Sequence, residues 1–315
     1  MTGLMARSWT DGDFVAYADL RNSITAAGGG DALLTESDVR SGLGPMLSDP
    51  EHDAKLLVSA DGALAAAAIV FAPSAGGERA RISGGVRPSW RDQGIGRELL
   101  DWALERLRLL HGASAPERDW LVNVHTPRHT DAGERLFARY GFRPERYFFD
   151  MKASLDPSSP RPVAPAPGRV LVTCLPPGLE GELYEAYVAA FEDHWGHEPI
   201  PLDRWRAMTV DSESYRSELS RVVLDGDEIV AFTLGFVGID GEVYIGGVGT
   251  RRRWRKRGLA SLLLNDVLGA AERAGLAVAR LDVDSDSVTG AVGVYERVGF
   301  RINATNCIFS RPLGD

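Results

Sequence analysis

The stretch Arg255-Lys256-Arg257-Gly258-Leu259-Ala260 decides the fold. It follows a strand-like run over residues 242–250 and opens an apolar-striped helix that extends to about residue 274. The first N–H groups of such a helix have no partner within it, and the helix dipole adds partial positive charge there. Gly258 lets the backbone approach a phosphate closely, and Ala260 keeps the next turn thin. The stretch therefore predicts an anion site at a strand-to-helix turn.

A second copy of this turn occurs earlier in the chain. Arg91-Asp92-Gln93-Gly94-Ile95-Gly96 lies between the strand-like run 81–87 and a helix that reaches about residue 110. Both copies read Arg-x-x-Gly-x-(Gly/Ala). Because they occupy matching positions, the pair is a much stronger signal than either loop alone.

A second motif is also repeated. Tyr295-Glu296-Arg297-Val298-Gly299-Phe300 ends a short helix near the C-terminus. Phe137-Ala138-Arg139-Tyr140-Gly141-Phe142 takes the corresponding place in the first half, with Phe where the second copy has Tyr. The chain is therefore predicted to be an internal repeat on the scale of a whole domain.

The order of expected elements is the same in both halves. Strands at 55–60 and 63–71 and at 221–224 and 229–237 form hairpins, each preceded by helical segments. A strand, a short helix and a last β segment follow each loop helix. This order predicts an α+β fold in which helices pack on a mixed sheet. The proline-rich residues 154–168 are expected to link an N-terminal domain, 1–153, to a C-terminal domain, 169–315.

Composition restricts the function classes. The chain has 315 residues, 44% hydrophobic and 25% charged, with a net charge of −9, which argues against a nucleic-acid surface. It has no apolar run of ~18 residues and no apolar signal-peptide core, so neither a membrane span nor secretion is expected. Cys174 and Cys307 are expected to be two buried thiols, one per domain, in a reducing cytoplasm. No metal-ligand spacing is present.

The two repeated motifs resemble those of the GNAT superfamily of acyl-CoA-dependent N-acetyltransferases. The loop is similar to the superfamily's pyrophosphate loop, and Tyr-x-x-x-Gly-Phe is its second marker. The first copy has Val86 and Pro88 ahead of its loop, as the superfamily pattern does, whereas Thr250 and Arg252 stand there in the second. Two tandem GNAT-like domains are the fold that this resemblance implies.

The resemblance implies acetyl-CoA as co-substrate, with its pyrophosphate on the loop and its pantetheine arm between two splayed strands. In the second copy the implied cofactor-binding residues are Val248, Gly249, Thr250, Arg255, Lys256, Arg257, Gly258, Leu259 and Ala260. In the first copy they are Val86, Arg91, Asp92, Gln93, Gly94, Ile95 and Gly96. A backbone N–H near Gly249 or Thr250 is the expected oxyanion donor.

Tyr295 matches the superfamily's general acid, which protonates the departing thiolate. A phenol at hydrogen-bond distance can supply that proton. Phe137 cannot, so the C-terminal domain is expected to be catalytic. The N-terminal domain either holds CoA without reacting it or is vestigial.

Glu242 is the expected base, because the superfamily often places a carboxylate on the strand that leads into the loop. Counting back from Arg255, the usual carboxylate position falls on Tyr244 instead. Period-two alternation keeps both residues on one face, and a bulge could absorb the shift. The alternative interpretation of Glu242 is a hairpin-edge residue beside Gly241.

Four further residues are expected near the acceptor. His194 and Trp195 lie in a loop that borders the acceptor site in this superfamily, and the alternative for them is a packed loop anchored by Trp195. Asp284 and Asp286 either orient an amine or cap the helix that follows.

These observations predict an acetyl-CoA-dependent N-acetyltransferase that acts on a small-molecule primary amine. Two rival interpretations stay open. The first is a non-catalytic CoA-binding or regulatory protein, motivated by Phe137 and by the offset of Glu242. The second is a nucleotide-binding protein, which fits less well because neither loop has a Gly-Lys-Ser/Thr ending.

Overall fold

The computed structural model describes residues 3–314, except for Ala32, Ala75, 128–130, 163–170, Pro199, 239–240 and Val288. Residues 163–168 of the expected linker, 154–168, therefore lie outside the described residues. The chain divides into two compact units. Unit 1 comprises Met1–Tyr147 and Asn306–Asp315, and unit 2 comprises Phe148–Thr305.

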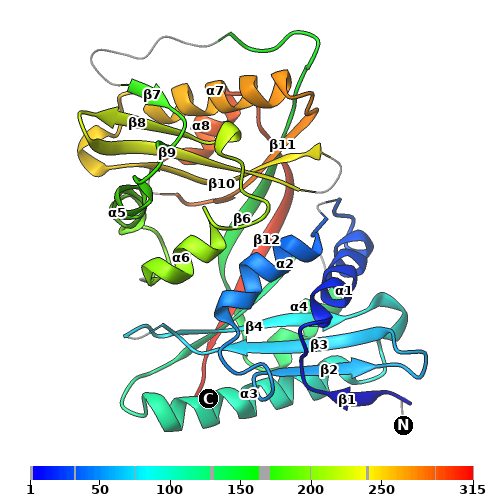
Figure 1. The fold of residues 1–315 in the computed structure, drawn as a ribbon. Coiled ribbons are helices and arrows are strands. Elements are labelled where there is room, and N and C mark those ends of the chain that lie inside the picture. Colours follow the sequence, from blue (N-terminus) through cyan, green and yellow to red (C-terminus); the bar gives the residue numbers. More distant parts are fainter. Residues whose placement is uncertain are drawn as a thin grey trace. The chain divides into compact units, whose positions relative to one another are not determined.

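Unit 1 is a mixed sheet with helices on both faces (Figure 1). Its strands are β1 (Met5–Arg7), β2 (Ala54–Val58), β3 (Leu64–Phe71), β4 (Arg79–Val86), β5 (Leu121–Pro127) and the end of β12 (Arg301–Pro312), in that order across the sheet. Its helices are α1 (Asp13–Ala27), α2 (Glu36–Leu43), α3 (Ile95–Ser114) and α4 (Asp131–Arg139). Neighbouring strands are antiparallel except for β4 and β5, which are parallel.

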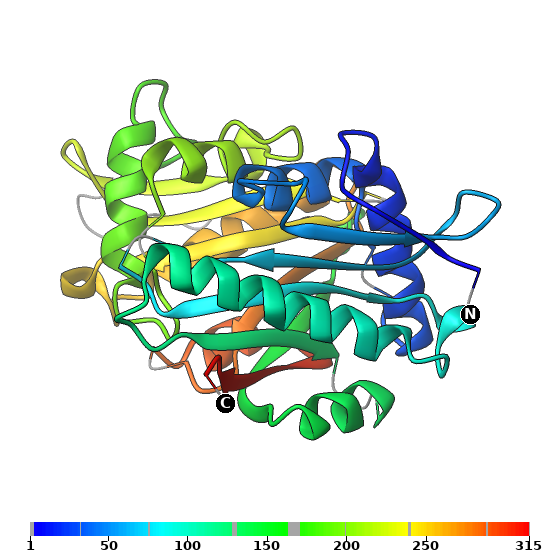
Figure 2. The same cartoon turned by 90° about the horizontal axis from the view of Figure 1, so that it is seen from below.

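Buried cores on both faces hold the helices of unit 1 to the sheet. Phe14, Tyr17 and Leu20 of α1 pack with Ile69 and Phe71 of β3 on one face. The apolar stripe of α3 packs with β4, β5 and β12 on the other face, which Figure 2 shows with α3 crossing in front of the strands. The sheet is therefore covered on both faces, which explains why every residue of β3 is buried.

Unit 2 has the same arrangement. Its strand order is β6 (Arg143–Ser154), β11 (Val278–Asp284), β10 (Val243–Thr250), β9 (Glu228–Val237), β8 (Arg221–Asp225) and β7 (Leu171–Thr173), of which β6 contributes residues from Phe148 onward. Its helices are α5 (Glu180–Phe191), α6 (Leu202–Met208), α7 (Leu259–Arg273) and α8 (Ala291–Arg297). The strands β10 and β11 are parallel, and their neighbours are antiparallel. One core joins the sheet to α7 and α8, and another joins it to α5 and α6.

Each unit is completed by a strand from the other half of the sequence. Residues 306–312 of β12 pair with β5 in unit 1, from Asn306↔Pro127 to Pro312↔Leu121. Residues 148–154 of β6 pair with β11 in unit 2, from Phe148↔Asp284 to Ser154↔Val278. The units therefore divide differently from the expected domains 1–153 and 169–315, because strand pairing rather than sequence order decides membership.

The structure confirms the predicted elements and the α+β class with a mixed sheet. Thr35 begins α2 with a capping box, in which its hydroxyl accepts from the Asp38 N–H and the Asp38 side chain accepts from the Thr35 N–H. The prediction of two buried thiols was wrong for Cys174. Cys307 is buried in unit 1, whereas Cys174 in unit 2 is exposed, where its Sγ lies 3.4 Å from Arg221 Nη1.

The described residues contain neither a candidate membrane-spanning helix nor a candidate metal-binding cluster. None of their helices is both long and apolar enough to cross a bilayer. Within the same ranges, no group of three or more histidine, cysteine or acidic side chains is placed to hold a metal ion.

Candidate active site

The loop before α7 has the backbone of an anion site. A 3₁₀ turn over Arg252–Trp254 ends β10, and Lys256 and Gly258 then both take positive φ, +61° and +78°. No side chain caps the N-terminus of α7. A Cβ on Gly258 would meet nothing within 4 Å, so the space beside the residue that precedes the helix is open. Uncapped donors facing open space fit a phosphate group.

Unit 1 repeats this backbone at the same motif positions. A 3₁₀ turn over Pro88–Trp90 leads into the loop, where Asp92 and Gly94 have φ of +62° and +82°. The helix α3 that follows also lacks a side-chain cap. A positive φ at a residue other than glycine is uncommon, so its recurrence at Asp92 and Lys256 supports a shared loop design.

A cavity of about 240 Å³ opens in unit 2 where two parallel strands separate. The strands β10 and β11 pair only at Val243↔Ala279 and Tyr244↔Arg280. Beyond Tyr244 the strands diverge, and the cavity lies along their edges. Its wall includes Tyr244 to Thr250 of β10 and Asp282 to Asp284 of β11.

A β-bulge and small residues shape this wall. The register between β10 and β9 shifts between Ile245 and Gly247, which places the bulge at Gly246. A Cβ at Gly246 would come within 2.6 Å of the Phe236 ring, and one at Gly249 would overlap the ring of Phe232. The glycines therefore let β10 pack closely against two aromatic rings, while the edge of β10 toward β11 stays unpaired beyond Tyr244.

Tyr295 lies on the cavity wall, as its predicted role requires. It belongs to α8, is 8% exposed, and packs edge-on against Phe300 of the same motif. Burial raises the pKa of the Tyr295 phenol above its usual value, so the side chain carries its proton at neutral pH.

The equivalent residue of unit 1 is a core aromatic. The ring of Phe137 packs against Phe142 and Phe309, with centroids 5.8 Å and 5.6 Å away. It carries no titratable group that could serve as an acid.

Glu242 is held in an ion-pair network and does not line the cavity. Its Oε2 accepts from Arg280 Nε at 2.5 Å, and Lys152 Nζ lies 4.0 Å from its Oε1. Arg280 is only 5% exposed and also donates to Asp150 Oδ2 at 3.4 Å. In this structure Glu242 neutralises a buried arginine.

Tyr244 and Asp282 form a polar pair on the cavity wall that sequence reasoning missed as a unit. The Tyr244 hydroxyl donates to Asp282 Oδ2 at 3.1 Å. Both side chains line the cavity, and Tyr244 is 39% exposed. Desolvation, with the nearby negative charge of Asp150, raises the pKa of Asp282 to about 6. The charge of Asp282 raises the pKa of Tyr244, together with burial.

Simple alternation could have revealed this pair. Val243 and Ile245 of β10 point into the core beneath α7 together with Leu281 of β11, so the polar residues between them must point to the opposite face. The position counted back from Arg255 also fell on Tyr244.

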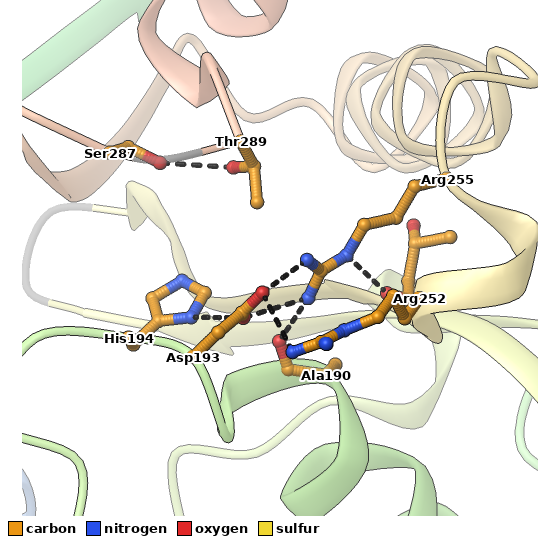
Figure 3. Close-up of polar contacts among 8 residues, drawn as sticks. Ala190, Asp193, His194, Arg252, Arg255, Ser287 and Thr289 are labelled. Atoms are coloured by element: carbon orange, nitrogen blue, oxygen red, sulfur yellow. Dashed lines mark hydrogen bonds and ion pairs between the residues drawn. The ribbon is translucent and has the colours of Figure 1, made fainter.

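Arg255 joins the loop that contains Asp193 and His194 to the end of β10 (Figure 3). It makes a two-pronged contact with Asp193, at 2.5 Å and 2.9 Å, and donates to the carbonyls of Ala190 and Thr250 at 2.9 Å and 3.2 Å. Hydrogen bonding from Arg255 lowers the pKa of Asp193 to about 2. The Arg255 side chain is thus engaged by protein, and the anion site of this loop rests on backbone N–H groups.

The remaining predicted cofactor residues separate into groups. In unit 2 the cavity is lined by Val248, Gly249, Thr250, Arg255 and Ala260. Leu259 is buried under the sheet with Leu263, and Lys256, Arg257 and Gly258 are exposed on the loop. In unit 1 Ile95 is buried, whereas Asp92, Gln93 and Gly94 are exposed and Val86, Arg91 and Gly96 are half-buried.

The structure brings two of the four predicted acceptor residues to the cavity. His194 and Asp284 line it, and Figure 3 shows the His194 ring beside Asp193. Desolvation lowers the pKa of His194, whose Nδ1 lies 3.7 Å from Asp193 Oδ1. Trp195 packs edge-on with Phe148. Asp286 is exposed, and its N–H donates to Asp284 Oδ1.

Comparison with known proteins assigns the class. A model of the acetyltransferase (GNAT) family matches residues 181–300, and a model of the acetyltransferase (GNAT) domain matches residues 52–144. The chain therefore belongs to the GNAT acetyltransferase family, as a tandem pair of such domains, and is an N-acetyltransferase. Members of this family use acetyl-CoA.

The relatives agree with this assignment. A mycothiol acetyltransferase of Tsukamurella paurometabola is 30% identical over 290 residues, which cover 85% of this chain and 90% of the relative. That of Paenarthrobacter aurescens is 29% identical over 270 residues, 81% of this chain and 76% of the relative.

Solved structures share the fold. A GCN5-related N-acetyltransferase from Sphaerobacter thermophilus aligns with a TM-score of 0.79 at 29% identity, covering 98% of this chain and 96% of that one. A tandem GNAT protein from the clavulanic acid biosynthesis pathway aligns with a TM-score of 0.68 at 18% identity, covering 99% of both chains, which supports the fold alone.

Proposed function

We propose that unit 2 transfers the acetyl group of acetyl-CoA to the primary amine of a small molecule, with Tyr295 as general acid. The observation that carries the proposal is one cavity that joins three features. It borders the uncapped N-terminus of α7, runs along the separated edges of β10 and β11, and contains Tyr295, Tyr244 and Asp282.

The residues fit the co-substrate in two places. The first N–H groups of α7, beyond Gly258, would hold the pyrophosphate. The open edge of β10 from Ile245 to Thr250 would hydrogen-bond an extended pantetheine arm, as an added strand does. When bound, acetyl-CoA supplies the activated thioester carbonyl.

The cavity then provides an acid and a base. Tyr295, protonated at neutral pH, donates its proton to the leaving sulfur. Asp282, whose pKa is about 6, is ionised at pH 7 and accepts the proton that the acceptor ammonium must lose. A backbone N–H near Gly249 or Thr250 would face the developing oxyanion.

Glu242 remains the alternative base. It lies on the same strand face as Tyr244, but Arg280 and Lys152 neutralise it outside the cavity wall. We therefore place Asp282 ahead of Glu242 and assign Glu242 to the positioning of Arg280.

The acceptor is proposed to be a cationic amine. Asp282 and Asp284 line the cavity, and Asp150 acts electrostatically on Asp282. This negative field attracts an ammonium group. One specific alternative is the acceptor of the mycothiol acetyltransferases, since the relatives carry that name and the run Glu242-Val243-Tyr244 before the loop resembles theirs.

The test is CoA-thiol release with a panel of small primary amines. We expect Tyr295→Phe to lower kcat by roughly 10²- to 10⁴-fold, with the KM for acetyl-CoA nearly unchanged, because only proton donation is removed. The control is Tyr140→Phe, which removes a hydroxyl bonded to Asp101 in unit 1 and should leave kcat unchanged.

Two outcomes would count against this proposal. Undiminished turnover in Tyr295→Phe would remove the assignment of the acid. Absence of thiol release above background with every amine would favour the non-catalytic CoA-binding interpretation.

A further inference from the structure

Unit 1 has basic groups where unit 2 has its polar pair. In unit 1, the parallel strands β4 and β5 pair from Arg79↔Leu121 to Ile82↔Val124 and then separate. Ala80, Ile82, Val122 and Val124 pack into the core beneath α3. Arg81 on β4 and His125 on β5 therefore point to the face that α1 covers.

The two repeats align through their buried residues. Ala80 and Ile82 of unit 1 match Val243 and Ile245 of unit 2, which lie just before the bulge. By this register Arg81 occupies the place of Tyr244. Pairing across the parallel strands in turn places His125 where unit 2 has Asp282.

A second arginine, from α1, joins this cluster. Arg21 Nη1 lies 3.4 Å from the Gly84 carbonyl, on the part of β4 beyond its pairing with β5. Its Nε is buried without a hydrogen-bond partner. Such a donor normally finds an acceptor, because leaving it unpaired costs free energy.

Hydroxyl and aromatic groups lie beside the cluster of Arg21, Arg81 and His125. The Tyr17 hydroxyl lies 2.9 Å from Ser83 Oγ, and the Arg81 guanidinium carbon lies 4.4 Å from the centre of the Phe71 ring. Arg81 and His125 both keep exposed side-chain surface, so a small molecule can reach them.

The charges in the cluster are of one sign. Desolvation and the positive charges of Arg21 and Arg81 lower the pKa of His125 to about 4. Desolvation likewise lowers the pKa of Arg81, where the charged or titratable neighbours are Tyr17 and Arg21. Among the residues that the structure describes, no carboxylate contributes to either shift. A buried guanidinium nitrogen without a hydrogen-bond partner, in a cluster of like charges, is costly, and a bound anion would offset that cost.

We propose that unit 1 binds a carboxylate of a small molecule at Arg21, Arg81 and His125, beside the separated ends of β4 and β5. Guanidinium groups match carboxylates in geometry and bind them through paired hydrogen bonds. The carboxylate could come from a free dicarboxylate, or from a carboxyl-terminated acyl group whose CoA lies on the loop Arg91–Gly96. Because Phe137 offers no acid, unit 1 holds this ligand without acyl transfer.

The experiment follows the His125 ring by NMR, with the signal assigned by its loss in His125→Asn. The full-length protein is titrated with succinate, succinyl-CoA, acetyl-CoA and inorganic phosphate. Carboxylate binding should raise the pKa of His125 by at least about one unit, because it neutralises the adjacent arginines. A response to succinate identifies a free acid, and a response to succinyl-CoA alone identifies an acyl group.

Affinity variants localise the site. Arg81→Gln should weaken the affinity for the compound that shifts the His125 pKa by about tenfold or more, as expected for loss of a charged hydrogen bond. Arg108→Gln, on an exposed position of α3, is the matched control and should bind as the wild type does. An unchanged affinity in Arg81→Gln would overturn the site.

Three results in the NMR titration would also overturn the proposal. They are an unchanged His125 signal with every compound at millimolar concentration, an equal pKa shift with acetyl-CoA, and tighter binding of phosphate than of either carboxylate source. None of these readouts depends on acetyl transfer in unit 2, so the proposal can fail while the proposed function stands.

Discussion

At the level of single residues, the cavity of unit 2 assigns proton donation to a tyrosine and proton acceptance to a carboxylate. Tyr295 is buried and protonated, whereas Asp282 has its pKa raised only to about 6 and is ionised at pH 7. Acid–base catalysis needs one group that is protonated and another that is ionised at the same pH, and the different environments of these two side chains provide both.

The pKa of Asp282 gives a pH prediction. A base must be ionised, so kcat/KM should fall about tenfold per pH unit below about 6 and level off above it. Asp282→Asn should lower activity by roughly 10²-fold or more and abolish this acid limb. The measurement is a pH–rate profile of both proteins.

Glu242→Gln provides the comparison. It removes the partner of Arg280 Nε, so we expect a lower melting temperature with the acid limb retained. An acid limb that disappears in Glu242→Gln and persists in Asp282→Asn would reverse the assignment of the base.

At the scale of elements, β10 depends on glycine to combine a packed face with an open edge. Gly249→Ala would force a Cβ into the Phe232 ring. Overpacking of this kind should destabilise the protein by about 1–3 kcal/mol. Gly238→Ala is the control, since a Cβ there meets nothing within 4 Å. Chemical denaturation measures both, and equal stabilities would show that the strand can move away from the ring.

Sequence predicted the elements well because each is encoded locally. The order of strands and helices follows from apolar periodicity, and the loops follow from glycine placed before an amphipathic helix. The position of Tyr295 on the cavity followed from its motif.

The contacts within the site were less predictable because they join distant segments. Arg255 was expected to bind phosphate, but its side chain meets Asp193, 62 positions earlier. Asp282 was not singled out, since its role depends on Tyr244 of a neighbouring strand and on Asp150. Contacts of this kind cannot be predicted from the local sequence of either segment alone.

At the scale of the whole molecule, each unit borrows a strand from the other half of the sequence. Sequence reasoning assigned the last β segment to the C-terminal domain, because nothing in its pattern states which sheet it joins. The strand β11 pairs with β10 at only two positions but with β6 at seven. The two halves are therefore predicted to depend on each other for folding.

Separate expression of residues 1–153 and 169–315 tests this dependence. The first fragment lacks the strand that covers β5, and the second lacks the strand that pairs with most of β11. Each alone should aggregate or unfold without cooperativity, because it exposes an unpaired sheet edge, whereas the co-expressed pair should assemble. Circular dichroism and soluble yield are the readouts. A soluble, cooperatively folded single fragment would contradict the prediction.

Of the two matched loops, the second is predicted to serve catalysis. Gly258 and Gly94 have nearly the same positive φ, and a Cβ on either meets open space, so a glutamate at the two positions meets the same space and the same backbone strain. The most direct measurement is acetyl-CoA turnover in Gly258→Glu and Gly94→Glu with the amine that the wild type accepts. A carboxylate in the anion site of unit 2 should abolish turnover in Gly258→Glu, while Gly94→Glu keeps it. Turnover lost in Gly94→Glu and retained in Gly258→Glu would contradict the account.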